Sequence, residues 1–283
     1  MMLPITRVYR PETLSEALFL RRDTAAIPLA AGTDIFVMAR SGKLKGSELL
    51  DISGIKEFRG IRREGDTLVI GALETHRAVS ESPLVRRLIP GLSEASSEVG
   101  APQIRARATI GGNICHASPA ADTVPALAAL GASAVIVSAG GTRELSVTDI
   151  MKGPGRTSLK EDELLSSVRV PLGGLSFSGF EKLGGRTALS IAVASCAAAV
   201  RDGVLTAAFG SMGPTVLEVP ELGDIYRSFL MDPRDADALI PVITDVLRGS
   251  LSPITDVRAS AEYRLRAAAG LFAALLERAA AKK

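Results

Sequence analysis

Two short glycine-containing segments carry the residue types that bind anionic groups through the backbone. They are residues 30–34 (AAGTD) and residues 109–113 (TIGGN). Glycine allows positive φ angles and lets a ligand approach the main chain without a Cβ atom in the way. Successive amide groups in such turns form a concave nest for phosphate oxygens. Neither segment contains Lys or Arg, so we expect any phosphate there to be held by neutral amide dipoles.

Taken alone, each segment is more simply interpreted as a tight turn between two strands. The chain contains neither GxGxxG nor GxxxxGKS/T, which excludes the Rossmann dinucleotide fingerprint and the P-loop. The Asp34 side chain is expected to cap a helix over residues 35–41 rather than to contact a ligand.

The segment after TIGGN adds an acidic group. Residues 117–122 read ASPAAD, and Pro125 follows within the next turn. Asp122 is therefore predicted to be the N-cap of a helix over residues 123–130. If the preceding turn binds a diphosphate, Asp122 also lies within reach of a ribose hydroxyl, so both interpretations stay open.

Composition excludes several classes of partner. The formal net charge is +2, aromatic residues make up 4% and Trp is absent, which argues against nucleic acid or an anionic membrane as the main partner. We see no signal peptide and no apolar run long enough to span a membrane, so a cytoplasmic protein is expected. Cys115 and Cys196 are too few to hold an iron–sulfur cluster, and both are interpreted as small buried residues.

Hydrophobic periodicity predicts an α+β protein whose helices and strands would position the two glycine segments and Asp122. A Gly-rich connector at 171–179 separates two regions. Helices are expected over 11–18, 76–80, 83–89, 91–99, 123–130, 235–248 and 255–281, and strands over 27–31, 48–52, 67–71, 134–138, 164–170, 191–201 and 204–211. The last two strands are expected to meet at a turn at Asp202-Gly203.

The order of the motifs resembles one family over nearly the whole chain. TIGGN followed by ASPxxDxxPAL is similar to the flavin-binding subunits of the molybdenum hydroxylases, which include the xanthine dehydrogenase flavin domain and the carbon monoxide dehydrogenase medium subunit. Further matching motifs are PLAAGTD at 28–34, GALET at 71–75, IRARA at 104–108, ELLSSVRVP at 163–171 and FEKLGGR at 180–186.

The resemblance implies a fold and a cofactor. It implies a two-lobed FAD-binding domain of the vanillyl-alcohol-oxidase (PCMH) type over residues 1–172, with lobes of about 1–55 and 56–172. A smaller C-terminal α+β domain would follow over 177–283. The implied FAD-binding residues are Ala30, Ala31, Gly32, Thr33, Asp34, Thr109, Ile110, Gly111, Gly112, Asn113, Asp122, Leu165 and Lys182. The two glycine segments would hold the diphosphate, Asp122 the ribose or adenine side, and Leu165 and Lys182 would lie near the flavin.

The implied function is electron transfer within a larger complex. In this family a large subunit holds the molybdenum–molybdopterin centre and a small subunit holds two 2Fe–2S clusters. Electrons pass from the clusters to FAD and then to NAD⁺, oxygen or another acceptor. The low cysteine count agrees with clusters on another chain. No catalytic residue and no metal ligand are expected on this one.

Two departures from the family pattern leave an alternative open. Ala31 stands where the family usually has glycine, and Ser190 where it often has Asp. Both would favour a member that has lost FAD and serves as a scaffold or interaction subunit. An independent FAD oxidase or cell-wall reductase is a more distant interpretation, since no matching second set of motifs occurs. Lys182 would either stabilise charge on the reduced flavin or be a solvated lysine, and His116 is interpreted as a loop imidazole without an assigned task.

Overall fold

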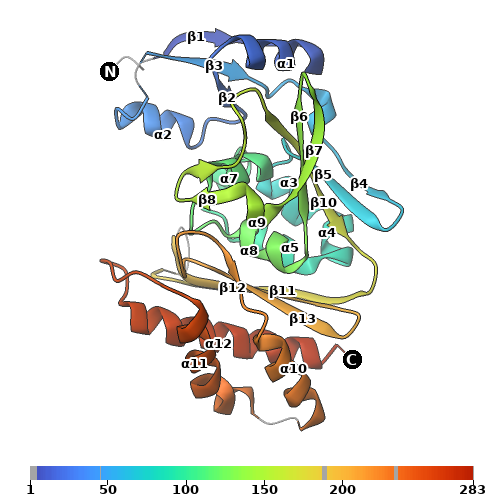
Figure 1. Cartoon of the computed structure of the whole chain (residues 1–283), viewed down its shortest axis with the longest axis vertical. Coiled ribbons are helices and arrows are strands. Elements are labelled where there is room, and N and C mark those ends of the chain that lie inside the picture. The colour runs from blue at the N-terminus through green and yellow to red at the C-terminus, as the bar shows by residue number, and fades with distance from the viewer. Residues whose placement is uncertain (1–4, 45, 187–189, 233–234, 283) are drawn as a thin grey trace.

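The computed structural model describes residues 5–44, 46–186, 190–232 and 235–282 (Figure 1). The first four residues and residue 283, which begin and end the two expected domains, lie outside the described residues. So do residues 187–189 of the expected C-terminal domain. The predicted α+β class is confirmed, because the described residues form helices packed against sheets of which the two largest are antiparallel.

The N-terminal region is a small parallel sheet with a helix on either side of β2 along the chain. Its elements are β1 (Ile5–Tyr9), α1 (Leu14–Asp23), β2 (Ile27–Leu29), α2 (Ile35–Arg40) and β3 (Ser47–Asp51), and the strand order is β1-β3-β2. Helix α1 begins where Thr13 accepts a hydrogen bond from the Glu16 amide at 3.2 Å, as a capping threonine does. This region presents residues 30–34 at the carboxyl end of β2.

The central region is an antiparallel sheet packed against short helices. Its strand order is β4-β5-β10-β6-β7. The strands are β4 (Ile61–Glu64), β5 (Thr67–Gly71), β6 (Ser133–Ser138), β7 (Gly141–Ser146) and β10 (Leu164–Pro171), with a two-stranded pair β8 (Met151–Gly153) and β9 (Arg156–Thr157). The helices are η1 (Lys56–Phe58), α3 (His76–Glu81), α4 (Pro83–Leu88), α5 (Pro90–Ser97), α6 (Pro102–Arg105), α7 (Ile110–His116), α8 (Thr123–Ala129) and α9 (Val147–Ile150).

The C-terminal region is a second antiparallel sheet with order β11-β12-β13-β14. Its elements are β11 (Leu175–Gly184), β12 (Ala192–Arg201), β13 (Val204–Gly210), β14 (Leu217–Glu218), α10 (Leu222–Met231), η2 (Ala236–Leu239), α11 (Ile240–Ser250) and α12 (Ala261–Ala280). The turn at Asp202-Gly203 has φ angles of 49° and 78°, which agrees with the two-residue hairpin predicted from the sequence.

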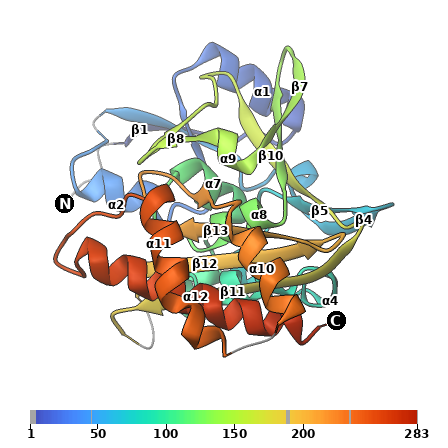
Figure 2. The same cartoon turned by 60° about the horizontal axis from the view of Figure 1, so that its bottom comes forward.

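Both faces of the C-terminal sheet are buried. Along β12, Ala197 and Ala199 pack into the core of the central region, whereas Cys196 and Ala198 pack against the C-terminal helices. Figure 2 shows the sheet between α10–α12 on one side and the central helices on the other. Helices α5 and α8 contact the inner face directly. The small side chains of β12 therefore let two layers approach the same strand.

Several sequence predictions are wrong in detail. Residues 175–179 of the expected connector belong to β11, and residues 11–13 of the first expected helix precede α1. Residues 255–259 were expected to be helical but precede α12, which begins after Ser260 accepts a hydrogen bond from the Tyr263 amide. Serine at this point ends the preceding irregular segment because its hydroxyl satisfies a free helix amide. Cys196 is buried as expected, but Cys115 is exposed, since it lies near the end of α7 where the chain reaches the surface.

Candidate cofactor site

The loop of residues 30–34 retains the features expected of an anion-binding nest. Gly32 has a φ of +78°, and a Cβ atom there would lie 2.3 Å from the Phe36 ring. Glycine is therefore required by both the backbone and the packing. Within the described part of the chain, no hydrogen bond is donated by the amides of residues 31–34. These amides are available to a ligand.

Ala31 does not strain this loop. The positive-φ residues of the described chain other than glycine are Ala117, Asp202 and Ser211. The methyl group of Ala31 thus carries no backbone penalty, because the cost applies only at positive φ. One of the two arguments for a subunit without FAD loses its physical basis.

The Asp34 side chain does not form the predicted helix cap. Asp34 occupies the N-cap position of α2, but its carboxylate accepts no capping hydrogen bond. Its Oδ2 instead lies 3.9 Å from Nδ1 of His116, the last residue of α7. The contact shows that the two glycine segments, 75 positions apart in sequence, belong to neighbouring elements. His116 thus faces the first segment, a role that its sequence neighbours did not indicate.

Residues 109–113 form the start of α7 and not a turn with positive φ. Thr109 is the N-cap, and its Oγ1 accepts a hydrogen bond from the Gly112 amide at 3.1 Å. The Ile110 amide donates to the Glu74 carbonyl and the Gly111 amide to the Ala72 carbonyl, each at 2.9 Å. The expectation of bare amides in this segment is therefore wrong, because the helix cap and the neighbouring chain use them.

The glycines of α7 serve close packing. A Cβ atom at Gly111 would lie 2.6 Å from the Ala72 Cβ and 2.8 Å from the Ala72 carbonyl oxygen. A Cβ atom at Gly112 would meet only the Thr109 hydroxyl, at 2.9 Å. The Asn113 side chain accepts a hydrogen bond from the buried Thr123 hydroxyl at 2.7 Å, which ties α7 to α8. Gly112 thus leaves the outer side of the first turn unobstructed.

Asp122 and Lys182 form a buried ion pair across the molecule. The Lys182 Nζ lies 2.7 Å from Asp122 Oδ2, and the two side chains are only 6% and 8% exposed. Lys182 also donates to the Glu98 carbonyl at 3.0 Å. The interpretation of Lys182 as a solvated lysine is wrong. Asp122 occupies the N-cap position of α8 but makes no capping bond, because its carboxylate turns to the lysine instead.

The second carboxylate oxygen of Asp122 is an unused acceptor. Oδ1 is buried and has no hydrogen-bond partner within the described chain. Burial raises the pKa of Asp122 to about 6, although the neighbouring Lys182 ammonium opposes the shift. A buried acceptor without a partner is costly, and a ligand hydroxyl would satisfy it.

Leu165 and the Glu98 carbonyl complete the surroundings. Leu165 is 5% exposed on β10 and belongs to the central core, and β10 packs against α7. The Glu98 carbonyl was not predicted, because a backbone group leaves no trace in residue types. Leu165 and Lys182 thus belong to different sheets, with β10 packed against α7 and β11 against α5.

These residues fit the cofactor that the sequence resemblance implies. Free amides around a glycine with positive φ suit a diphosphate, and the unpartnered Asp122 oxygen suits a hydroxyl donor. No groups of three or more metal-ligating side chains occur among the described residues, and no helix in that part of the chain is long and apolar enough to cross a membrane.

Comparison with known proteins identifies the class. A family model described as the FAD binding domain in molybdopterin dehydrogenase matches residues 4–173. A second, described as the CO dehydrogenase flavoprotein C-terminal domain, matches residues 181–279. The chain therefore belongs to the FAD-binding subunits of the molybdopterin dehydrogenases, and it is a subunit of an oxidoreductase.

Relatives and solved structures are similar to this chain over nearly its full length. The nicotinate dehydrogenase FAD-subunit of Eubacterium barkeri is 32% identical, covering 93% of this chain and 92% of the relative. The carbon monoxide dehydrogenase medium chain of Hydrogenophaga pseudoflava is 31% identical, covering 93% of each. A solved carbon monoxide dehydrogenase from that organism has a TM-score of 0.88 at 29% identity, covering 100% of this chain and 99% of the other. Quinoline 2-oxidoreductase from Pseudomonas putida 86 has a TM-score of 0.89 at 25% identity, covering 99% of each chain. The two-lobed FAD-binding fold expected from the motifs is confirmed.

Proposed function

We propose that this chain is the electron-transfer subunit of a three-subunit molybdenum hydroxylase. Its FAD would receive electrons from 2Fe–2S clusters on a small partner subunit and pass them to NAD⁺, oxygen or another acceptor. A large partner subunit would hold the molybdenum–molybdopterin centre and hydroxylate the substrate. The proposal also includes a cytoplasmic location. The relatives named as subunits of such dehydrogenases support it.

The residue roles follow from the available donors and acceptors. We propose that the amides of residues 30–34 hold the diphosphate, because they have no described partner. Residues 109–113 would line the same site through the unobstructed side of Gly112 rather than through their amides. Asp122 Oδ1 would accept a hydrogen bond from a ribose or ribityl hydroxyl, and Leu165 would supply an apolar wall. FAD would supply the redox chemistry.

Lys182 is proposed to hold Asp122 ready for the cofactor. Its ammonium, fixed by the Glu98 carbonyl and by Oδ2, favours the ionised carboxylate and leaves Oδ1 as the open acceptor. A carboxylate held in this way accepts a stronger hydrogen bond than a neutral group does. The same cation would also lower the energy of any negative charge that develops beside it.

We propose the domain division at residues 1–172 and 177–283, with lobes of about 1–55 and 56–172. The matched ranges of the two family models support it. The Lys182–Asp122 pair then joins the two domains at the proposed site. This pair is the single observation on which the proposal rests most heavily, because it brings Lys182 of the C-terminal domain to Asp122 of the FAD-binding domain.

The cofactor is tested by reconstitution with a matched pair of glycine variants. The purified chain is incubated with excess FAD, desalted and examined for the absorption of a bound oxidised flavin. Gly32 and Gly42 both have positive φ, 78° and 74°, but only Gly32 belongs to the proposed site. We expect Gly32→Ala to lose FAD and Gly42→Ala to retain it, although each carries similar backbone strain.

Two outcomes would contradict the proposal. A wild-type chain that stays colourless would support the scaffold subunit instead. Equal retention of FAD by both glycine variants would remove the 30–34 loop from the site. The partners are tested separately, by co-purification of this chain with an iron–sulfur subunit and a molybdenum-binding subunit encoded beside it. Failure to recover either subunit would contradict the proposed assembly.

A further inference from the structure

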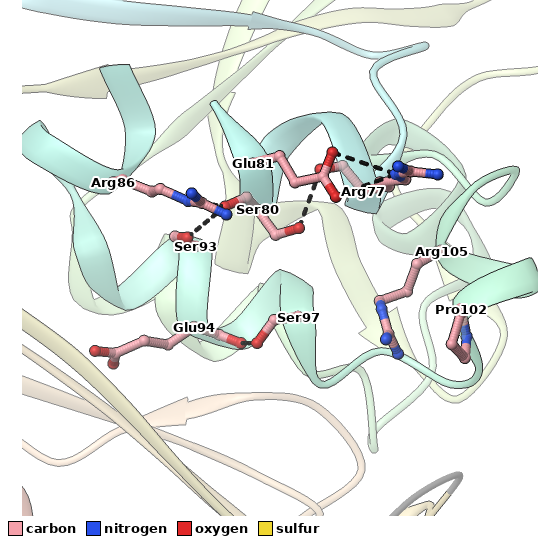
Figure 3. A pocket seen from close by; sticks show the side chains of 9 residues that line it. All are labelled: Arg77, Ser80, Glu81, Arg86, Ser93, Glu94, Ser97, Pro102 and Arg105. Carbon is pink, nitrogen blue, oxygen red and sulfur yellow. Dashed lines mark hydrogen bonds and ion pairs between the residues drawn. The ribbon is translucent and has the colours of Figure 1, made fainter. Parts of the chain in front are cut away.

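A cationic cavity lies beside α3, α5 and α6 and contains none of the proposed FAD-binding residues. Its volume is about 500 Å³, which is within the range of small-molecule sites. Three arginines line it, namely Arg77, Arg86 and Arg105. Figure 3 shows Arg86 and Arg105 on opposite sides of the serines of α3 and α5.

Each arginine is anchored through one part of its guanidinium group. Arg77 Nε donates to Glu81 at 3.1 Å, Arg86 Nε to the Ser80 carbonyl at 2.8 Å, and Arg105 Nη1 to the Gly100 carbonyl at 2.9 Å. The Nη2 atom of each has no acceptor within the described chain. These side chains are therefore held in place by the protein and still have donors to offer, so a ligand would lose little entropy in ordering them.

The acidic residues of the cavity do not cancel the positive charge of the three arginines. Glu81 pairs with Arg77. The carboxylate of Glu94 accepts hydrogen bonds from residues outside the cavity lining. Its Oε1 accepts from Arg278 at 2.6 Å and its Oε2 from the Phe180 amide at 2.9 Å. Arg278, which also pairs with Glu181, partly offsets the charge of Glu94 from outside the cavity lining. The arginines thus leave a net positive field in the cavity.

The serines supply acceptors and not donors. The hydroxyl groups of Ser80 and Ser97 each donate to a backbone carbonyl of their own helix, at 3.0 and 2.7 Å, and that of Ser93 on α5 donates to the Ser80 carbonyl on α3 at 2.8 Å. Their protons are therefore committed, while their oxygen lone pairs remain available. A complementary ligand combines an anionic group for the arginines with hydroxyl donors for the serines.

We propose that this cavity binds a phosphate monoester that carries hydroxyl groups, such as a phosphorylated sugar. The free guanidinium donors of Arg86 would bind the phosphate, whose oxygens a guanidinium group matches in pairs, and Arg77 and Arg105 would add to the positive field. The serine oxygens would accept from the sugar hydroxyls. The site is separate from the proposed cofactor site and does not depend on FAD binding. The limited volume of the cavity favours a compact ligand over an extended acidic peptide.

The test is calorimetric titration of the full chain, loaded with FAD where it binds, with ribose 5-phosphate, ribose and inorganic phosphate. We expect ribose 5-phosphate to bind at least tenfold more tightly than either of the other two. Arg86→Gln should weaken it at least tenfold. Arg87→Gln, one residue along the same helix and outside the cavity lining, should change it less than twofold. Bound FAD should stay in place throughout.

Several results would overturn the proposal. They are the absence of binding at millimolar ribose 5-phosphate, equal effects of the two arginine variants, displacement of FAD by the sugar phosphate, and tighter binding of a poly-glutamate peptide. Arg77→Gln gives a second variant if Arg86→Gln does not fold. Arg77 is 64% exposed, so its loss should spare the fold and still weaken binding.

Discussion

Asp122 shows how far residue type alone predicts a site. An acidic residue before TVP is typical of a helix cap, and its spacing from TIGGN indicates a ligand contact. The partner that decides its role is Lys182, 60 positions away. No local pattern encodes that pairing, because it depends on how the C-terminal sheet packs against α5 and α8. The predicted helix cap is therefore wrong, the ligand contact of Asp122 stays a prediction, and its buried pairing with Lys182 was not predicted.

We expect the raised pKa of Asp122 to make FAD affinity depend on pH. An accepted hydrogen bond from the cofactor favours the ionised carboxylate, so binding should be weaker where Asp122 is protonated. We expect FAD to bind about tenfold more weakly at pH 5 than at pH 8, with the change centred near the pKa of about 6. Fluorescence titration measures this directly. Asp122→Asn should bind more weakly than wild type at pH 8 and show a flatter profile, and an unchanged profile would remove Asp122 from the site.

Removing the lysine should destabilise the fold in a pH-dependent way. Lys182→Met leaves a buried carboxylate without its cation, which costs on the order of 3–5 kcal/mol. The folded pKa of Asp122 already exceeds its ordinary value of 3.8. The stability that protonated, buried Asp122 contributes is therefore present at low pH and is lost as the pH rises through about 6.

Denaturant unfolding at pH 5 and pH 8 measures this effect. The loss in Lys182→Met should be large at pH 8 and smaller at pH 5, where protonation removes the uncompensated charge. The double variant Asp122→Asn/Lys182→Met should recover part of the stability at pH 8. A loss that is equal at both pH values would show that Lys182 acts through packing alone.

At the scale of elements, helix α7 shows where sequence reasoning reaches its limit. Two adjacent glycines are typical of a turn. Some of the strands and most of the longer helices were predicted because periodicity and caps are local, but other strands, such as β7 and β11, were not. The Thr109 cap is also local, yet the TIGGN segment was interpreted as a turn. The close contact between Ala72 and Gly111 could not be predicted from the sequence, because it joins segments 39 positions apart. The first glycine of the motif therefore serves close packing.

Replacing Gly111 tests this packing. Gly111→Ala brings a Cβ atom to 2.6 Å from the Ala72 Cβ, and overpacking of this kind costs about 1–3 kcal/mol. Gly270→Ala in α12 is a matched control, because a Cβ atom there meets nothing within 4 Å. Alanine in that helix should stabilise the protein by about 0.5–1 kcal/mol. Thermal unfolding compares the two, and an equal gain in both would contradict the packing role of Gly111.

At the scale of the whole molecule, the two matched family regions share one core. Phe180, Ala197 and Ala208 of the C-terminal sheet belong to the same buried cluster as Leu165 and Ile110 of the central region. Arg278 near the end of α12 reaches both Glu94 on α5 and Glu181 on β11, at 2.6 and 2.7 Å. The sequence predicted a connector between two regions. It did not predict that β12 would be buried on both faces, because an alanine-rich strand has no distinct apolar side.

Removing the C-terminal region should therefore also weaken the packing and the proposed FAD site of the remaining region. A fragment of residues 1–172 would expose the inner apolar surface that β11–β13 cover and would leave Asp122 without Lys182. We expect this fragment to unfold at a lower temperature than the full chain and to bind FAD at least tenfold more weakly, because both the packing and the buried cation are lost. Circular dichroism and flavin titration of the fragment and the full chain measure the two effects. A fragment that matches the full chain in both would show that the FAD site is complete within residues 1–172 and that the Lys182–Asp122 pair serves only to join the regions.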